Sequence, residues 1–296
     1  MIDPRQRFAR PPFPQQDAID MPGSTRQLDP AAVHGEAAPG DEGGYRGSGR
    51  LRGLKTLITG GDSGIGRAVA IAYAREGADV LINYLSEDRD AEETVRHVRD
   101  AGVRGEAIRG DLTDEAFCNS LIDQAFDRFG GLDVLVNNAA YQETRDSIDQ
   151  WDTELFDRIY KTNVYATFWL CRAAIPRMKP GSGIINTVSI QAYDPSPELL
   201  PYATTKSALT GMTKALAKVA IEDGIRVNAV APGPVWTPLI PGSMPPDKFQ
   251  QFGDNTLFGR PAQPIELSPV YVWLASREAS YITAEVYGVT GGRSPV

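Results

Sequence analysis

The chain has 296 residues, of which 42% are hydrophobic and 23% charged, and its formal net charge is −8 at pH 7. This length is enough for one large α/β domain with a sizeable core. The acidic balance argues against a nucleic-acid partner, which favours a basic surface. No run of about 18 apolar residues occurs, so we predict no membrane-spanning segment.

The cysteines and histidines argue against a disulfide-stabilised protein and against a metal-binding protein. Cys118 and Cys171 each lie in a stretch with helical spacing of apolar residues, so they are expected to be buried side chains rather than a disulfide framework. His34 and His97 are isolated in the sequence, and no Cys/His cluster has metal-ligand spacing, so no metal site is predicted. The N-terminus lacks the apolar stretch of a secretory signal, and we expect a cytoplasmic protein.

Residues 1–50 differ in composition from the rest of the chain. They are rich in proline and glycine and poor in branched aliphatic residues. Such a segment cannot bury enough apolar surface to offset the entropy lost on ordering, so we expect an extended arm. It either packs on its own domain or on a neighbouring subunit, or it remains a passive tail. Residues 51–296 are expected to form a single catalytic domain.

Strand-like apolar runs alternate with helical patterns from residue 51 onward. Strands are predicted at residues 55–59, 79–84, 104–108, 133–137, 183–188, 226–230 and 285–289. Helical faces are predicted from the spacing of Ile65, Val69, Ala72 and Tyr73, of Phe117, Leu121, Ile122 and Ala125, and over 151–178 and 202–223. This alternation predicts an α/β fold, a Rossmann-type doubly wound parallel sheet of seven strands with helices on both faces.

A glycine-rich loop follows the first predicted strand and leads directly into a helix. Gly60 permits a tight turn, Gly64 permits close approach of the backbone to a pyrophosphate, and Gly66 lets the helix pack near the strand. The free N–H groups at the start of that helix attract phosphate. Glycines in a turn can be purely structural, but strand, loop and helix together predict dinucleotide binding.

The spacing Gly-x-x-x-Gly-x-Gly resembles the classical short-chain dehydrogenase/reductase family. Further family motifs follow in order: Asp111-Leu112, Asn137-Asn138-Ala139-Ala140, Asn163, Ser189, Tyr202-x-x-x-Lys206, Pro232-Gly233 and Thr237. Ala140 departs from the family's glycine at that position. The end of the arm together with the glycine loop is similar to a bacterial subgroup with an extended N-terminus, described as general stress-type or aldehyde-reducing oxidoreductases.

The resemblance implies a proton-transfer site around Tyr202. Tyr202 and Lys206 lie one helical turn apart on one face. A phenol has an ordinary pKa near 10, and a neighbouring ammonium or an oxidised nicotinamide favours the phenolate. In the family, Ser189 would hold the substrate oxygen, and Asn163 would position a water that links Lys206 to solvent. Taken singly, each of these residues also fits a structural role, such as a half-buried helix tyrosine.

The resemblance also implies the cofactor contacts. The predicted contacts are Gly60, Asp62, Ser63, Gly64, Ile65, Gly66, Asn83, Tyr84, Ser86, Asp111, Leu112, Asn138, Ala139, Tyr202, Lys206, Pro232, Gly233, Val235 and Thr237. No acid occupies the end of the second strand before Glu87, and an acid there would repel the 2′-phosphate of NADP. Asn83 and Ser86 are candidate donors to that phosphate. The sequence therefore favours NADP(H), with NAD(H) possible.

The sequence says less about the substrate than about the cofactor. Residues 234–264 are rich in proline and glycine, and the family forms a mobile substrate lid there. Candidate pocket walls are Gln191, Tyr193 and Trp236. The resemblance further implies a small carbonyl or alcohol substrate and a homotetramer formed through helices 151–178 and 202–223. Two alternatives remain open, namely an NAD-dependent sugar or polyol dehydrogenase and a non-catalytic nicotinamide-binding regulator.

Overall fold

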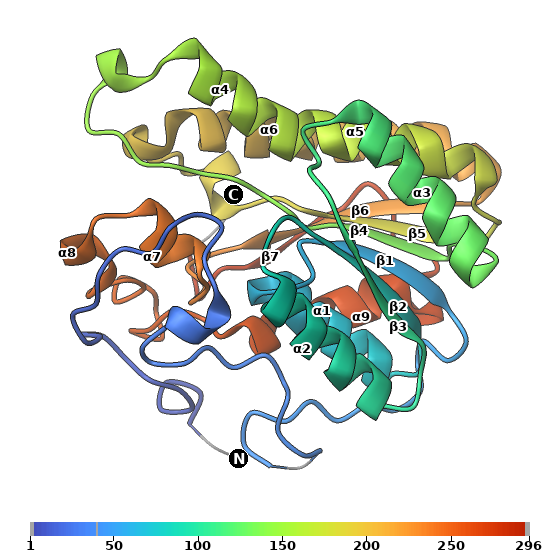
Figure 1. Cartoon of the computed structure of the whole chain (residues 1–296), viewed down its shortest axis with the longest axis horizontal. Coiled ribbons are helices and arrows are strands. Elements are labelled where there is room, and N and C mark those ends of the chain that lie inside the picture. The colour runs from blue at the N-terminus through green and yellow to red at the C-terminus, as the bar shows by residue number, and fades with distance from the viewer. Residues whose placement is uncertain (1–2, 40, 294–296) are drawn as a thin grey trace.

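A seven-stranded parallel sheet forms the centre of the computed structural model, which describes residues 3–39 and 41–293 (Figure 1). The strands are β1 (Lys55–Thr59), β2 (Asp79–Tyr84), β3 (Gly105–Arg109), β4 (Val134–Asn137), β5 (Gly183–Thr187), β6 (Arg226–Pro232) and β7 (Val286–Val289). They are ordered β3-β2-β1-β4-β5-β6-β7. The predicted Rossmann-type fold is confirmed, and the strand order reverses between β1 and β4, which creates the crevice where such sheets bind ligands.

Helices cover both faces of the sheet (Figure 1). One face carries α1 (Gly64–Arg75), α2 (Asp88–Asp100) and α9 (Pro264–Ala275), and the other carries α3 (Glu115–Phe129), α4 (Thr153–Tyr160), α5 (Ala166–Ala174) and α6 (Leu200–Ala220). Alternate strand residues enter the two cores: Ile58 packs with the α1 side, and Leu57 packs with the α3 side. Burial on both faces explains why the strands are nearly continuous apolar runs.

Two stretches differ from the sequence-based expectation. The predicted helix 151–178 is divided, because a π-helical segment (Lys161–Tyr165) separates α4 from α5 and a 3-10 turn with Pro176 follows α5. Residues 234–264 contain the short helices α7 (Leu239–Ser243) and α8 (Pro246–Phe249). Their prolines stand where helices begin, positions that need no backbone N–H, so a composition typical of loops is compatible with helix.

The N-terminal arm packs against its own domain, one of the alternatives that the sequence left open. In Figure 1 it runs from the α7 and α8 region to the side of α1 and α2. The ring of Phe13 lies 4.4 Å from that of Trp236, and the Trp236 indole donates a hydrogen bond of 2.7 Å to the carbonyl of Pro30. With Leu28, Ile240 and Phe249, these side chains form a small apolar core between the arm and residues 234–264, the segment expected to form the substrate lid.

A second anchor holds the end of the arm at the C-terminus of α1. The carboxylate of Glu76 is fully buried and accepts hydrogen bonds from the Tyr45 hydroxyl (2.8 Å), from the backbone of Ser48 and Arg50, and from the Arg50 guanidinium. Burial alone would raise the pKa of Glu76, but these donors lower it to about 2. Its stabilising contribution is therefore fully present above the ordinary pKa of glutamate and is lost progressively as the pH falls toward about 2.

Both cysteines are buried and unpaired, as the sequence predicted, and burial raises the pKa of each thiol to about 12. They therefore remain protonated at neutral pH. Among the described residues, no helix has the length and apolar character needed to cross a bilayer. In the same part of the chain, no group of three or more His, Cys, Asp and Glu side chains is arranged to hold a metal ion.

Replacing Glu76 with glutamine should lower the free energy of unfolding by about 2 to 4 kcal/mol, because buried donors lose a charged acceptor. Urea denaturation at neutral pH measures this change. Glu222→Gln is the matched control, since Glu222 is an exposed acid just after α6. Equal stability of the two variants would show that Glu76 does not anchor the arm.

Candidate active site

A cavity of about 1120 Å³ opens at the carboxyl ends of the central strands. Its walls include Gly60 after β1, Asn138 after β4, Thr187 at the end of β5 and Pro232 at the end of β6. This is the point where the strand order reverses. A dinucleotide and a small substrate fit a cavity of this size and place.

The glycine loop has the shape that a phosphate cradle requires. Gly60 (φ +60°) and Gly64 (φ +49°) adopt left-handed backbone conformations that side chains rarely allow. A Cβ atom at Gly66 would lie 2.0 Å from the Gly60 carbonyl oxygen, so only glycine lets α1 begin this close to β1. The Asn138 amide donates to the carbonyls of Thr59 and Gly60 and fixes the turn. The loop therefore fits a pyrophosphate at the start of α1.

Most of the predicted cofactor contacts line the cavity. These are Gly60, Asp62, Ser63, Gly64, Ile65, Asn83, Tyr84, Asp111, Leu112, Asn138, Ala139, Tyr202, Lys206, Pro232, Gly233, Val235 and Thr237. Gly66 lies behind the loop and acts through helix packing. The structure does not place Ser86 with the other predicted cofactor contacts. Ser86 is exposed, its hydroxyl donates a hydrogen bond to Glu87, and it does not line the cavity.

The end of the cavity beside β2 is acidic. Asn83 is buried and its amide donates to the carbonyls of Ile108 and Gly110, so it is not free to donate to a phosphate. Glu87 and the buried Asp62 both line the wall. Burial raises the pKa of Asp62 to about 6, and the nearby carboxylates of Glu87 and Asp90 act in the same direction. The sequence shows no acid at the end of β2 before Glu87, and the structure brings Glu87 itself to the cavity wall.

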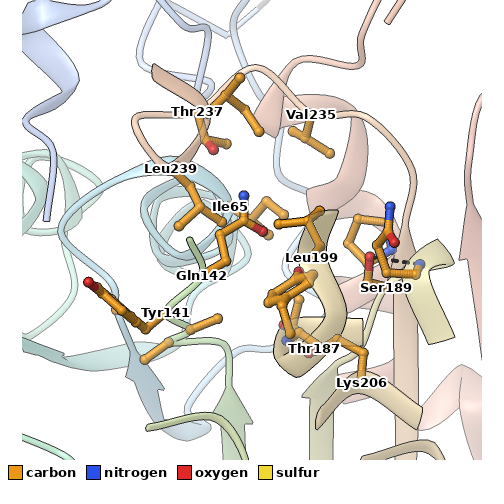
Figure 2. A pocket seen from close by; sticks show the side chains of 18 of the residues that line it. Ile65, Tyr141, Gln142, Thr187, Ser189, Leu199, Lys206, Val235, Thr237 and Leu239 are labelled. Atoms are coloured by element: carbon orange, nitrogen blue, oxygen red, sulfur yellow. Dashed lines mark hydrogen bonds between the residues drawn. The ribbon is translucent and has the colours of Figure 1, made fainter. Parts of the chain in front are cut away.

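Tyr202, Lys206 and Ser189 converge at the opposite end of the cavity. The Lys206 ammonium donates a hydrogen bond of 2.7 Å to the Thr187 carbonyl and lies 5.3 Å from the centre of the Tyr202 ring. Burial raises the pKa of the Tyr202 phenol, and the Ser189 hydroxyl beside it offsets part of that rise. Figure 2 shows Ser189, Thr187 and Lys206 beside one another along the cavity wall.

Burial shifts Tyr202 and Lys206 toward their neutral forms. It raises the pKa of Tyr202 to about 12 and lowers the pKa of Lys206 to about 7. An amine with a pKa near neutrality can both release and accept a proton at working pH. A positive charge placed in the cavity would favour the phenolate form of Tyr202. The pair can therefore exchange a proton with a bound oxygen.

Asn163 lies beside this pair but does not line the cavity. Its side-chain oxygen accepts from the backbone of Tyr141 (2.8 Å), and its amide donates to the Tyr141 carbonyl and to the Thr205 hydroxyl, both at 3.0 Å. Asn163 stands in the π-helical segment, a type of helix that often occurs at functional sites. Its hydrogen bonds join the loop after β4 to α6, and the predicted water contact stays a prediction.

The predicted substrate walls need correction. Trp236 is fully buried between the arm and the lid, so it is not a pocket wall. Tyr193 is also outside the cavity wall, with 38% of its surface exposed. Gln191 does line the cavity, although its side-chain oxygen accepts from the backbone of Ser196. An aromatic residue in a lid sequence does not reveal whether it faces the cavity or a distant segment.

Several lining residues were missed by sequence reasoning. Tyr141, Gln142, Leu199 and Leu239 are grouped around the cavity in Figure 2, and Met244 also lines it. The Gln142 amide donates a hydrogen bond of 2.7 Å to the Ser243 hydroxyl, which joins the loop after β4 to α7. The signal for Tyr141 and Gln142 was their position directly after Asn137-Asn138-Ala139-Ala140, since residues that follow a strand's carboxyl end face the crevice.

A dinucleotide cradle and a buried tyrosine and lysine at the switch point of a parallel sheet define a nicotinamide-dependent oxidoreductase. The sequence model of the family described as enoyl-(acyl carrier protein) reductase matches residues 60–294. General stress protein 39 of Bacillus subtilis is 47% identical over 280 residues, which cover 95% of this chain and 96% of that protein. The chain belongs to the classical short-chain dehydrogenase/reductase family and is an enzyme of that type.

Other relatives carry names that specify a substrate or a cofactor. The glucose and ribitol dehydrogenase of Daucus carota is 42% identical over 286 residues, covering 95% of this chain and 96% of that protein. A Burkholderia cenocepacia short-chain dehydrogenase in complex with NADP has a TM-score of 0.77 at 30% identity, covering 82% of this chain and 99% of the other. A Brucella melitensis 3-ketoacyl-(acyl-carrier-protein) reductase complexed with NADH has a TM-score of 0.74 at 34% identity, with coverage of 82% and 99%. Together they support a nicotinamide cofactor without deciding which one.

Gly66→Ala should weaken nicotinamide cofactor binding by more than about tenfold, a loss of about 1.4 kcal/mol. The added methyl group would collide with the Gly60 carbonyl and force α1 away from the cradle. Gly211→Ala is the matched control, because a Cβ atom on this α6 glycine meets nothing within 4 Å. Calorimetric titration of each variant measures the affinity, and unchanged binding by Gly66→Ala would refute the cradle.

Proposed function

We propose that this enzyme interconverts a carbonyl group and an alcohol, with Tyr202 as the general acid and base. The observation that carries the proposal is the convergence of Tyr202, Ser189 and Lys206 at one end of a cavity whose other end is the glycine loop. Family members share the fold, but this proposal rests on the site. A hydride donor bound in the cradle would extend toward the tyrosine.

A nicotinamide cofactor bound in the cradle would supply or accept the hydride. In reduction, the Ser189 hydroxyl holds the carbonyl oxygen while the Tyr202 phenol donates a proton to it. Lys206, whose pKa lies near neutrality, stabilises the phenolate that results and helps to return a proton to it. In oxidation, the Tyr202 phenolate takes the proton of the alcohol. Lys206, which also lines the cavity, would in addition bind the ribose beside the nicotinamide, as the family resemblance implies.

The substrate class is proposed only as a small carbonyl or alcohol compound. The cavity has an apolar part and a polar part. The apolar part is lined by Leu199, Leu239 and Met244, and the polar part by Tyr141 and Gln142. The polar part, together with the similarity to a glucose and ribitol dehydrogenase, supports a sugar or polyol substrate as the second candidate. A non-catalytic regulator is less well supported, because the tyrosine and the lysine are both present and both reach the cavity.

For the cofactor, we propose that the preference for NADP(H) over NAD(H) is weaker than the sequence alone indicates. The sequence favours NADP(H) because no acid ends β2. The cavity wall adds the carboxylates of Glu87 and Asp62 beside β2, where a 2′-phosphate would meet like charge. The candidate donors Asn83 and Ser86 are engaged elsewhere. The acidic wall therefore offsets the missing acid at the strand end.

We also retain the homotetramer as a proposal. Tyr165 and Phe168 of the α4–α5 region and Val219 of α6 are each more than two-fifths exposed, which suits an apolar contact between subunits. A cytoplasmic location stays a prediction, and the two unpaired thiols are compatible with it.

Tyr202→Phe should lower kcat by at least about a hundredfold, because the proton donor is lost while the ring remains. Cofactor affinity should stay near the unmodified value. The absorbance of reduced nicotinamide, followed with a panel of aldehydes, ketones and sugars, measures both directions. Tyr193→Phe is the matched control, since Tyr193 lies outside the cavity wall. Substantial turnover by Tyr202→Phe would remove Tyr202 from the proposal.

Glu87→Gln should raise the affinity for NADPH relative to NADH by roughly fivefold, corresponding to about 1 kcal/mol of charge repulsion near the surface. Titration of both reduced cofactors by fluorescence gives the ratio. Glu92→Gln serves as the control, because Glu92 is exposed on α2 and is not part of the cavity wall. An unchanged ratio would show that Glu87 does not face the 2′ position.

A further inference from the structure

We propose that the N-terminal arm supplies a wall of the nicotinamide-cofactor site and retains the bound cofactor. Met21, Pro22 and Gly23 line the same cavity as the glycine loop and Thr237. The surrounding segment, residues 19–26, is called the strap below. This inference rests on the proposed function only in requiring that the cavity binds a nicotinamide cofactor.

On one side the strap lies directly against the lid helix α7. The backbone N–H of Ile19 donates to the carbonyl of Pro241 at 3.2 Å. A Cβ atom at Gly23 would lie 3.1 Å from Cβ of Pro238, and one at Gly242 would lie 2.4 Å from the sulfur of Met21. These contacts leave no space between strap and helix, so displacing one of them requires the other to repack.

On the other side the strap is fixed to α2 by a buried carboxylate. Asp90 is 1% exposed, and its Oδ2 accepts from the Ser24 hydroxyl (3.0 Å) and from the backbone N–H of Thr25 (2.7 Å). The Arg26 guanidinium adds an ion pair of 3.2 Å to Glu93. Detaching the strap would leave the buried Asp90 carboxylate without these donors, and an unpaired buried charge costs several kcal/mol.

The two attachments place the strap over the phosphate-binding part of the cavity. Thr94 of α2 donates to the carbonyl of Asp62 in the glycine loop, so the α2 anchor is tied to the cradle. At the lid, a Cβ atom on Gly64 would lie 3.2 Å from the Thr237 side chain, so the start of the lid faces the start of α1. The strap spans from this lid edge to α2. A cofactor seated in the cradle would lie beneath it along the pyrophosphate and the adenosine.

Retention follows from this placement. Cofactor that leaves toward the lid side must displace either α7 or the strap, and the two are packed together and anchored at Asp90. The strap should therefore act mainly on the dissociation rate of the cofactor, because it adds a barrier to escape as well as apolar contact from Met21 and Pro22. A strap that served only folding would leave that rate unchanged.

Hydrogen exchange of the full chain, with and without NADH, tests the contact directly. The expected result is slower exchange of the backbone amides of residues 19–26 when NADH is present, alongside slower exchange of the glycine loop. Residues 5–10 at the start of the arm should not change. Protection of the glycine loop without any protection of the strap would overturn the inference while leaving cofactor binding intact.

A variant then tests retention. Gly23→Val places a bulky side chain between Ile19 and Pro238 and should lift the strap from the lid. We expect the dissociation rate of NADH, followed by its fluorescence after displacement, to rise about tenfold. Arg5→Ala is the control in the same arm, because Arg5 is exposed and bonds only to Asp3 in the described part of the chain.

The outcomes separate the two proposals. A dissociation rate of Gly23→Val within about twofold of that of the unmodified protein would refute retention by the strap. If the unmodified protein binds neither NADH nor NADPH, the proposed function fails first and the strap has no cofactor to hold.

Discussion

The hydrogen bond between the Lys206 ammonium and the Thr187 carbonyl joins the parts on which the site depends. A lysine that is 1% exposed must find compensation for its lost hydration, and the end of β5 provides it. That contact fixes the rotation of α6 against the sheet, which places Tyr202 one turn away beside Ser189. Asn186 next to Thr187 bonds to Asn137 of β4 and to Thr213 of α6, so the same strand end ties three elements together. A buried polar network of this kind specifies one arrangement, since any slip leaves donors unpaired.

The parts of the molecule that the sequence predicted are those governed by local rules. Strand and helix periodicity, the glycine spacing and the Tyr202–Lys206 interval each act within a few residues, and the seven strands follow the predictions closely. The errors fall where the outcome depends on distant contacts. Trp236 reads as a pocket wall until its partner Phe13, from the opposite end of the chain, is known. The sequence predicts Asn83 as a phosphate donor, but its amide donates to the carbonyls of Ile108 in β3 and of Gly110 just after it.

The arm shows the same limit most clearly. Its composition predicts a segment that cannot bury enough apolar surface to fold alone, and the structure shows the domain holding the arm at several points. Phe13 and Leu28 pack on the lid, Tyr45 bonds to Glu76, and the strap bonds to Asp90. Each anchor pairs a short arm motif with a residue far along the chain. Composition shows that the arm has no core of its own, but it does not show which surface of the domain the arm packs on. Only the structure shows that the arm reaches the cavity.

The central claim is that the enzyme transfers a hydride, within this cavity, between a nicotinamide cofactor and a carbonyl carbon. Its most direct test uses reduced cofactor with deuterium at the transferring position, incubated with the enzyme and a mixture of aldehydes, ketones and aldoses. Mass spectrometry of the products should find an alcohol with a single deuterium on its carbinol carbon. Cofactor that binds in the cradle but never passes deuterium to any carbonyl compound would contradict the account.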